Sequence, residues 1–423
     1  MLALDGGTPA VSRPIRPFNA IGSDERDAVL RVLDSARPLS GFYGSPQPGF
    51  FGGPEVLALE SAWCARFGCA HAVAVNSATS GLVAAVGAAG IGPGDEVILP
   101  PVTMSATAMA VLAYGGIPVF VDLEPDHFCL DPDLVEAAIT PATRAIIAVN
   151  LFGHPAELIR LRALADARGL VLIEDNAQAA LGTELGRWCG TIGHIGVFSL
   201  NVHKHIQAGE AGVCVTDAAD FARRVQLIRN HGENVVEWLG VDDLTNAFGF
   251  NYRPTEITAA VALAQLGRIE ERVARCEHIG TRLSAALHDF PGLVPPPVRT
   301  GCRHVYFMWT AKFDAAQVGC SRAAFCNALK AEGVPVAEGY VRPLYHLPLF
   351  QQRRAMGRDG FPFTLTDRRY PPGLCPVAED LYAHSIIQFQ PVSWDVDDEQ
   401  IDMIAAAFRK VHAAAGRLGG NAV

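Results

Sequence analysis

The chain has 423 residues, half of them hydrophobic, with a formal net charge of -10 and a pI of about 5.7. This length suits two or three domains, or a large α/β domain with a smaller one. No long run of Lys or Arg occurs, which argues against nucleic-acid binding, although a local site can still be positive enough for an anionic substrate. No apolar stretch approaches the length of a membrane span, and the ten cysteines lack a C-x-x-C pair. We therefore expect a soluble, cytoplasmic protein with unpaired thiols.

Between residues 70 and 216, short apolar runs alternate with helical stretches. Apolar strands separated by helices indicate a mostly parallel sheet that is covered on both faces. Ligands of such sheets bind beyond the carboxyl ends of the strands, so catalytic residues are expected there. The seven strands are predicted at His71–Val75, Glu96–Leu99, Pro118–Val121, Arg144–Val149, Leu170–Ile173, Ile195–Ser199 and Gly212–Val215.

The pattern changes after about Glu271, where strands and helices no longer alternate regularly. This part indicates a smaller α+β domain, so we divide the chain into a large domain, 1–270, and a small domain, 271–423. The elements expected around and after this boundary are a long helical stretch at Ala260–His288, an apolar run at Val305–Ala311, a helix near Ser321–Glu332 and an amphipathic helix at Asp397–Ala415.

A segment of small and hydroxyl residues, Asn76–Gly81, follows the first strand and opens a helix. Free backbone N–H groups around Ala78, together with the hydroxyls of Ser77 and Thr79, suit a phosphate at the helix N-terminus. Taken alone, the segment is better explained as a simple helix cap.

Asp175 lies at the end of the fifth strand, where a buried carboxylate needs a cationic partner. A protonated pyridine nitrogen is such a partner, and a carboxylate beside it makes the ring a better electron sink. Gln178, three residues on, can hydrogen-bond a phenolate oxygen on the same ring. Taken alone, Asp175 is explained slightly better as the cap of the next helix.

Lys204 lies in a loop between two apolar strands and has no acidic residue among its immediate neighbours. A lysine in such a place loses its proton more easily and can act as a nucleophile, although a lone loop lysine is usually just solvated. His203 and His205 flank it, but no Cys, Asp or third His lies nearby at ligand spacing, so we expect no metal.

Together these segments are more specific than any one of them. A phosphate-binding helix start, a strand-end carboxylate and a loop lysine, in this order on one sheet, are what pyridoxal 5'-phosphate (PLP) requires. A further polar segment, Gly249–Arg253, by itself indicates only a turn.

On these residues the sequence resembles the DegT/DnrJ/EryC1/StrS family of aminotransferases, which are PLP enzymes of fold type I. The resemblance runs through nearly the whole chain. It implies a mostly parallel seven-stranded sheet flanked by helices, with a smaller C-terminal α+β domain. Its most specific parts are Glu174–Gln178, Ser199 with Lys204 before Gly209–Gly212, and Gly249–Arg253.

The resemblance also implies roles for single residues. Lys204 would hold the cofactor covalently and move the proton, with Asp175 on the pyridinium and Gln178 near the ring oxygen. The phosphate would be held by Ser77, Ala78, Thr79 and Ser199, and by Asn251 of a neighbouring subunit, which implies a homodimer with shared sites.

Three positions depart from the family pattern. Ala78 stands where the family usually has Gly, and its methyl crowds the phosphate loop. Met104 stands where an aromatic residue usually stacks on the cofactor ring, and a thioether packs there with different geometry. Ala211 alters the family's Gly-x-Gly-Gly loop.

The expected reaction is an amino transfer from glutamate or glutamine to a ketone of a nucleotide-linked sugar. A keto-cyclitol is the alternative acceptor, because the opening Gly6-Gly7-x-Pro resembles that branch. An aromatising dehydratase of the aminohydroxybenzoate type is a further alternative. The candidates for substrate contacts, for each of which ordinary packing is an equally good explanation, are Tyr340, Arg342, Tyr345 and His346. The loop Pro38–Gly53 is expected at the surface, where it can close over a substrate.

Overall fold

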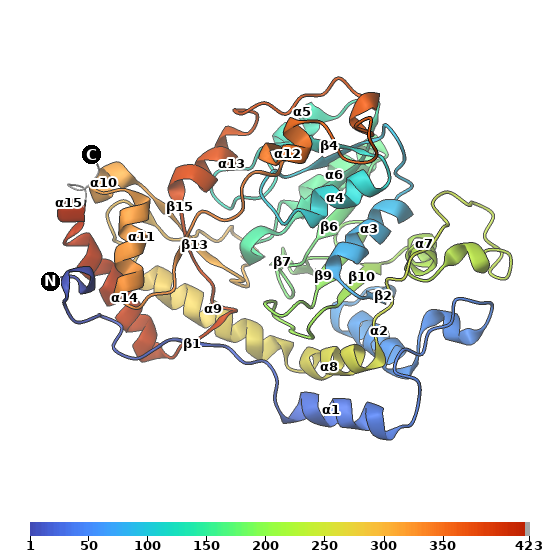
Figure 1. Ribbon diagram of the computed structural model, residues 1–423, viewed down its shortest axis with the longest axis horizontal. Coiled ribbons are helices and arrows are strands. Elements are labelled where there is room, and N and C mark those ends of the chain that lie inside the picture. The colour runs from blue at the N-terminus through green and yellow to red at the C-terminus, as the bar shows by residue number, and fades with distance from the viewer. Residues whose placement is uncertain (419–423) are drawn as a thin grey trace.

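The computed structural model describes residues 1–418 and shows a large part built on a seven-stranded sheet, beside a smaller part that holds the N-terminus (Figure 1). Helix α9 (Ile269–Ala286) begins at the predicted division and runs between the two parts. The N-terminal segment lies against the small part, because β1 (Arg16–Pro17) pairs with β16 (Trp394–Asp395). The division at residue 270 stays a prediction.

The central sheet has the strand order β2-β10-β9-β6-β5-β3-β4. Strands β9, β6, β5, β3 and β4 run parallel, and β10 is antiparallel to both of its neighbours. The predicted mostly parallel sheet of seven strands is therefore confirmed. Its strands are β2 (His71–Val75), β3 (Glu96–Leu99), β4 (Ile117–Phe120), β5 (Thr143–Val149), β6 (Val171–Asp175), β9 (Ile195–Ser199) and β10 (Gly212–Thr216).

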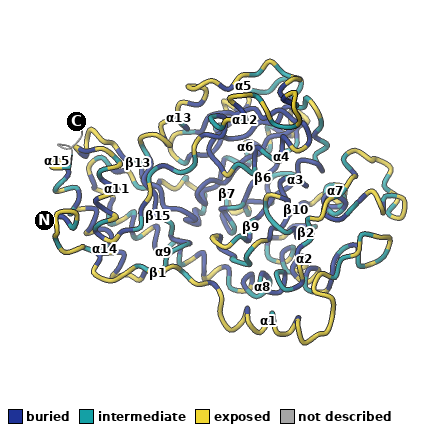
Figure 2. Tube along the Cα trace, viewed as in Figure 1, coloured by how far each residue is buried: buried dark blue, intermediate teal, exposed yellow. Residues whose placement is uncertain are grey.

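Both faces of this sheet are buried, as Figure 2 shows by the dark strands at the centre of the large part. Along β2, Val73 and Val75 join one apolar core while Ala72 and Ala74 join another. Successive side chains of a strand point to opposite faces, so the two cores lie on opposite sides of the sheet. The helices of the large part are α1 (Ser23–Asp34), α2 (Pro54–Phe67), α3 (Ala78–Ala88), α4 (Ala106–Ala113), α5 (Pro132–Ala138), α6 (Leu158–Arg168), α7 (Ala219–Arg229) and α8 (Glu256–Leu266).

The small part contains a four-stranded antiparallel sheet with the order β11-β13-β15-β14, which confirms the expected α+β pattern. The strands are β11 (Leu293–Val294), β13 (Trp309–Phe313), β14 (Ala337–Glu338) and β15 (Ile386–Phe389), and the main helices besides α9 are α11 (Arg322–Ala331) and α14 (Asp398–His412). A separate three-stranded sheet joins β12 (Cys302–Arg303), β7 (Thr183–Glu184) and β8 (Arg187–Trp188).

The long helical stretch predicted at Ala260–His288 is divided between two helices. Helix α8 ends at Leu266, and α9 begins at Ile269 after a break at Gly267 and Arg268. The break lets α8 pack on α1 and α2 of the large part while α9 packs on α14 of the small part. The apolar pattern of a helix does not tell whether the helix packs on the large part or on the small part. A single glycine inside such a pattern is only weak evidence that the helix ends there.

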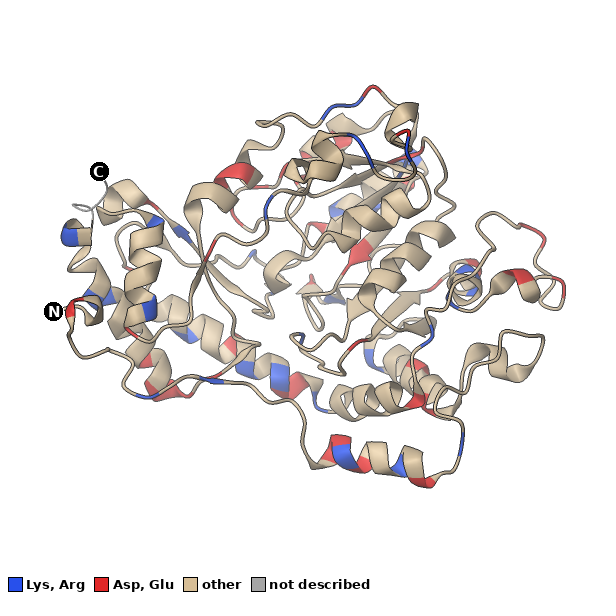
Figure 3. Cartoon of the chain, in the orientation of Figure 1, with Lys and Arg blue, Asp and Glu red and all other residues tan. Residues whose placement is uncertain are grey.

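Charged residues of both signs alternate along α1 and α9, as Figure 3 shows. Within residues 1–418, no helix is long and apolar enough to cross a membrane. All ten cysteines are free thiols. The segment from residue 38 to 53 projects from the large part beside residues 232–250 (Figure 1); residues 38–40 are exposed, whereas its end, after a short 3-10 helix at Pro48–Phe51, is buried.

Candidate active site

Three of the predicted site residues lie at one edge of the central sheet. Asp175 is the last residue of β6, and Ser199 is the last residue of the neighbouring strand β9. Lys204 follows β9 in the loop that returns to β10. Because β6 and β9 run parallel, both carboxyl ends open toward the same side, which is where ligands of such sheets bind.

The N-terminus of α3 lies against this edge. Gly212, the first residue of β10, pairs with both Ser199 and Val75, and α3 begins three residues after Val75. A side chain at Gly212 would lie 2.7 Å from the backbone nitrogen of Ala78, so only glycine permits this close approach. The approach brings Ser199 next to the start of α3.

Ser77 caps α3. Its hydroxyl oxygen accepts a hydrogen bond of 3.0 Å from the Ser80 N–H, and Thr79 in the first turn is exposed. The N–H groups of Ala78 and Thr79 have no acceptor within residues 1–418, as expected for the first turn of a helix. Open N–H groups beside hydroxyls at the positive end of an eleven-residue helix fit a phosphate.

Asp175 is buried, and its carboxylate accepts only uncharged donors. The Thr107 hydroxyl donates to Oδ2 over 2.8 Å, and the Ala177 N–H donates to Oδ1 over 3.2 Å. Burial raises the pKa of Asp175, while these hydrogen bonds and the charge of Lys204 act in the opposite direction. A buried carboxylate without a hydrogen-bonded cation fits a cationic ligand group such as a pyridinium.

Lys204 is buried, with 8% of its surface exposed, and its amine forms neither a hydrogen bond nor an ion pair within residues 1–418. The chain has four lysines, and two of the others, Lys312 and Lys410, are paired with carboxylates. Burial lowers the pKa of Lys204 to about 8, against the attraction of Asp175. Roughly a tenth of the amine is therefore neutral at pH 7, far more than for an ordinary lysine, and the neutral form is the one that acts as a nucleophile or a base.

The two histidines beside Lys204 take different positions. His203 is exposed, whereas His205 is buried and its Nε2 donates to the carbonyl of Val305 over 3.2 Å. Burial lowers the pKa of His205 to about 4, so the ring stays neutral. In the described part of the chain, no group of three or more His, Cys, Asp or Glu side chains is arranged to hold a metal ion.

Gln178 connects the large part to the small part. Its Oε1 accepts from the Phe152 N–H over 2.7 Å, and its Nε2 donates to the Tyr340 hydroxyl over 3.0 Å. The rings of Phe152 and Tyr340 meet edge to face at 5.1 Å. Tyr340 is thus the one substrate candidate that is hydrogen-bonded to another predicted site residue.

The remaining candidates are spread more widely. Met104 is 60% exposed, and the Asn251 side chain is exposed. Arg342 is also exposed and forms no ion pair within residues 1–418. Tyr345 is fully buried, and both its hydroxyl and His346 Nε2 are hydrogen-bonded to Glu379, not to any of the other predicted site residues.

Sequence reasoning missed three residues around the site: Thr107, Phe152 and Phe307. Thr107 could have been selected from the sequence, because it is a polar residue in an otherwise apolar helix start. The Phe307 ring lies 4.3 Å from the Lys204 amine, and Phe152 donates to Gln178. Both are ordinary aromatic residues far along the chain from their partners, so only the tertiary structure brings them to the site.

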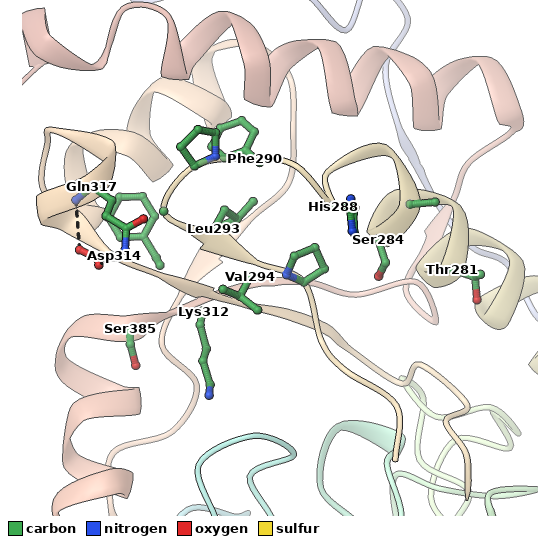
Figure 4. Close-up of a pocket in the computed structure, with 15 residues that line it drawn as sticks. Thr281, Ser284, His288, Phe290, Leu293, Val294, Lys312, Asp314, Gln317 and Ser385 are labelled. Atoms are coloured by element: carbon green, nitrogen blue, oxygen red, sulfur yellow. Dashed lines mark hydrogen bonds between the residues drawn. The ribbon is translucent and has the colours of Figure 1, made fainter. Parts of the chain in front are cut away.

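A large cavity of about 1040 Å³ lies in the small part, around α9, β11 and β13 (Figure 4). Its walls are mostly apolar and include Phe290, Leu293 and Val294. None of the 15 lining residues is a predicted site residue. The cavity is therefore separate from the group of residues around Lys204.

A profile described as the DegT/DnrJ/EryC1/StrS aminotransferase family matches residues 47–409. The L-glutamine:2-deoxy-scyllo-inosose aminotransferase of Streptomyces kanamyceticus is 37% identical over 84% of this chain and 85% of its own. The protein of the same name from Streptoalloteichus tenebrarius is 34% identical over 99% of both chains.

Two solved structures of differently named enzymes are similar to this chain. DesI, solved in the presence of its TDP-sugar product, has a TM-score of 0.80 and 30% identity, covering 98% of this chain and 96% of its own. A 3-amino-5-hydroxybenzoic acid synthase has a TM-score of 0.79 and 25% identity, covering 95% and 99%.

Proposed function

Because this chain belongs to the DegT/DnrJ/EryC1/StrS aminotransferase family, we propose that it moves the amino group of glutamine to the ketone of a cyclitol. The chain is a PLP-dependent aminotransferase of fold type I. One observation carries the choice of substrates: two relatives named for glutamine and 2-deoxy-scyllo-inosose match it over most or all of its length. This reverses the order expected from the sequence, which placed a nucleotide-linked sugar first.

The residues around Lys204 suit the phosphate and the pyridine nitrogen of PLP. The start of α3, with Ser77, Ala78 and Thr79, and the end of β9 at Ser199 would hold the phosphate. Asp175 would face the pyridine nitrogen, which supplies the cation that its buried carboxylate lacks. When bound, PLP supplies the electron sink that lets a C–H bond beside the donor's amino group break.

The side chains of the site have two kinds of role, proton transfer and the orientation of other side chains. Lys204 Nζ, partly neutral near neutral pH, accepts a proton and in its charged form returns it. The Thr107 hydroxyl holds Asp175 in one orientation, and Tyr340 with Phe152 does the same for Gln178. Asp175 and Gln178 are therefore held before the substrate arrives and do not have to be ordered during the reaction.

Arg342 is proposed to bind an anionic group of the substrates. It follows Tyr340 by two residues and is exposed without a carboxylate partner in the described part of the chain. The loop that carries it then returns to the large part, where the Leu344 N–H donates to the Pro101 carbonyl over 2.7 Å. Pro101 precedes Met104 by three residues, so this loop lies beside the segment that carries Met104. A planar guanidinium is well suited to the carboxylate of an amino-acid donor.

We also propose a homodimer in which Asn251 reaches the cofactor of the neighbouring subunit. The Asn251 side chain is exposed, and Phe248 and Phe250 beside it are 50% and 37% exposed. Exposed aromatic residues on a projecting segment are typical of an interface. Ten free thiols favour a reducing compartment, and we propose the cytoplasm.

A nucleotide-linked keto-sugar is the second candidate acceptor. The observation in its favour is the similarity to DesI, whose structure was solved with a TDP-sugar product. The aromatising dehydratase is less favoured, since it rests on the likeness to one structure at 25% identity.

The two acceptors are separated by one absorption experiment. The holoenzyme is converted to its aminated form with glutamine, freed of excess donor, and mixed with 2-deoxy-scyllo-inosose or with a nucleotide-linked 4-keto-sugar. We expect the cyclitol ketone to restore the visible band of the lysine-bound cofactor within seconds to minutes, and the nucleotide sugar to leave it unchanged. Restoration by the nucleotide sugar alone would overturn the proposed acceptor and keep the aminotransferase.

A further inference from the structure

The Lys204 amine has one close neighbour that belongs to neither its own loop nor the central sheet. Phe307 lies between β12 and β13, and its ring centroid is 4.3 Å from Lys204 Nζ. Phe307 is buried, with 3% of its surface exposed. Since the amine forms no hydrogen bond or ion pair within residues 1–418, the ring face is the most specific contact that this amine makes.

The position of Phe307 is set by backbone contacts on both sides of it. The Val305 N–H donates to the Gly153 carbonyl over 3.0 Å, and the Met308 N–H donates to the Phe152 carbonyl over 3.1 Å. A side chain at Gly153 would lie 2.8 Å from the Phe307 nitrogen, so this loop fits closely against the segment.

The lysine loop is attached to the same segment. His205, the residue after Lys204, donates from its ring to the Val305 carbonyl. The loop that carries the amine and the segment that carries the aromatic ring are therefore held in a fixed relation. The Lys204 loop and the segment around Phe307, which are far apart in sequence, are thus directly hydrogen-bonded to each other.

We propose that Phe307 is a positioning residue for Lys204, whose ring face holds the protonated amine in place whenever that amine is not attached to the cofactor. The proposal rests on the proposed transamination, because only that reaction releases the amine and requires it again in the same place. The face of an aromatic ring carries partial negative charge and attracts a cation, most strongly where water is excluded.

The other titratable groups around the amine cannot replace the ring. Asp175 attracts the charged amine, but its carboxylate is hydrogen-bonded to Thr107 and is the group proposed above to face the cofactor. His203 and His205 also lie near the Phe307 ring, at 6.3 Å each. Partial loss of solvation and the charge of Lys204 lower the pKa of His203, and burial lowers that of His205, so both stay neutral near pH 7. Burial of the amine itself opposes its charge. The ring is thus the neighbour that favours a charged amine at this position without competing for the cofactor.

The test titrates the free lysine in the holoenzyme. The protein is first converted to its aminated form with glutamine, which frees Lys204, and is then pulsed with acetic anhydride at a series of pH values. Mass spectrometry of the peptide that contains Lys204 gives its reactivity against pH. We expect Phe307→Leu to lower the pKa of Lys204 by roughly one unit, which is a ~10-fold gain in reactive amine below that pKa. Phe307→Tyr keeps the ring and is expected to titrate like the wild type.

Two further variants separate this effect from general packing. Phe313→Leu removes a buried ring of β13 that does not contact Lys204, and is expected to leave the titration unchanged. Replacing Phe307 with pentafluorophenylalanine keeps the shape but removes the negative ring face, so it serves even if Phe307→Leu fails to fold. It is expected to shift the titration as Phe307→Leu does.

The possible results distinguish the two proposals. If the wild type never forms a visible lysine-bound cofactor band, the proposed function fails. If that band forms but the fluorinated variant titrates like the wild type, the role of Phe307 is refuted. A shift of equal size in Phe307→Tyr would also refute it, because the ring face is then irrelevant.

Discussion

Replacing Thr107 with Val removes the side-chain hydrogen bond that holds Asp175. The two side chains have nearly the same shape, and Thr107 is fully buried, so the change deletes a donor without opening a cavity. The lost bond of 2.8 Å ends on a carboxylate, and hydrogen bonds to charged groups contribute about 1.5–3 kcal/mol. Since the hydroxyl favours the ionised acid, its loss raises the pKa of Asp175 further.

The measurement is the dissociation constant of PLP, followed by absorption between pH 6 and pH 8.5. In the proposed site an ionised Asp175 faces the pyridinium, so we expect Thr107→Val to weaken binding by about 10-fold to 100-fold, with the larger loss at the acidic end. Thr103→Val is the matched control, because Thr103 Oγ1 lies 3.3 Å from Thr107 Oγ1 and is not hydrogen-bonded to Asp175. Affinity within ~2-fold of the wild type at every pH in Thr107→Val would refute this role of the hydroxyl.

Three further changes have expected outcomes. Gly212→Ala places a methyl 2.7 Å from the backbone nitrogen of Ala78, so thermal unfolding and PLP titration should show lower stability and weaker cofactor binding; unchanged values would contradict the close approach. Tyr340→Phe removes the partner of Gln178, and the half-reaction with glutamine should slow by about 2-fold to 10-fold in stopped-flow absorption. His154 has its pKa lowered to about 2 by burial, so the unfolded chain takes up the proton first and stability is lost as the pH falls below ~6.5. From pH 6.5 to pH 5 this group costs about 2 kcal/mol, and chemical denaturation of His154→Gln should show a correspondingly smaller loss.

The large part was predictable because its strands are continuous apolar runs. The seven predicted strands agree with the observed ones to within two residues at each end, since burial on both faces leaves a strong signal. Lys204, Asp175 and Ser77 could be placed at one edge for the same reason: each follows a strand, and the direction of the strands decides where they meet.

The small part was less predictable, because some of its apolar residues form strands while others pack on loops of the large part. The run predicted at Val305–Ala311 is a strand only from Trp309 onward. Its first residues bind the carbonyls of Gly153 and Phe152 instead of a neighbouring strand. Nothing in the local pattern distinguishes a segment that docks on another loop from one that extends a sheet.

It is equally hard to predict from sequence which polar residues near a site contact the other site residues. Tyr340 and Tyr345 lie in the same short run, yet one is hydrogen-bonded to Gln178 and the other to Glu379. The partner of each hydroxyl comes from a distant segment, so the difference arises only from tertiary packing.

The most direct test of the whole account is to find which lysine carries the cofactor. The chain has only four lysines, and Lys204 is the one buried without a carboxylate partner. Purified holoenzyme is reduced with borohydride, digested and examined by mass spectrometry, with Lys204→Ala as the control. We expect a phosphopyridoxyl group on Lys204 alone, and neither such a peptide nor turnover in the variant. The same group on Lys312, Lys330 or Lys410, or full turnover by Lys204→Ala, would contradict it.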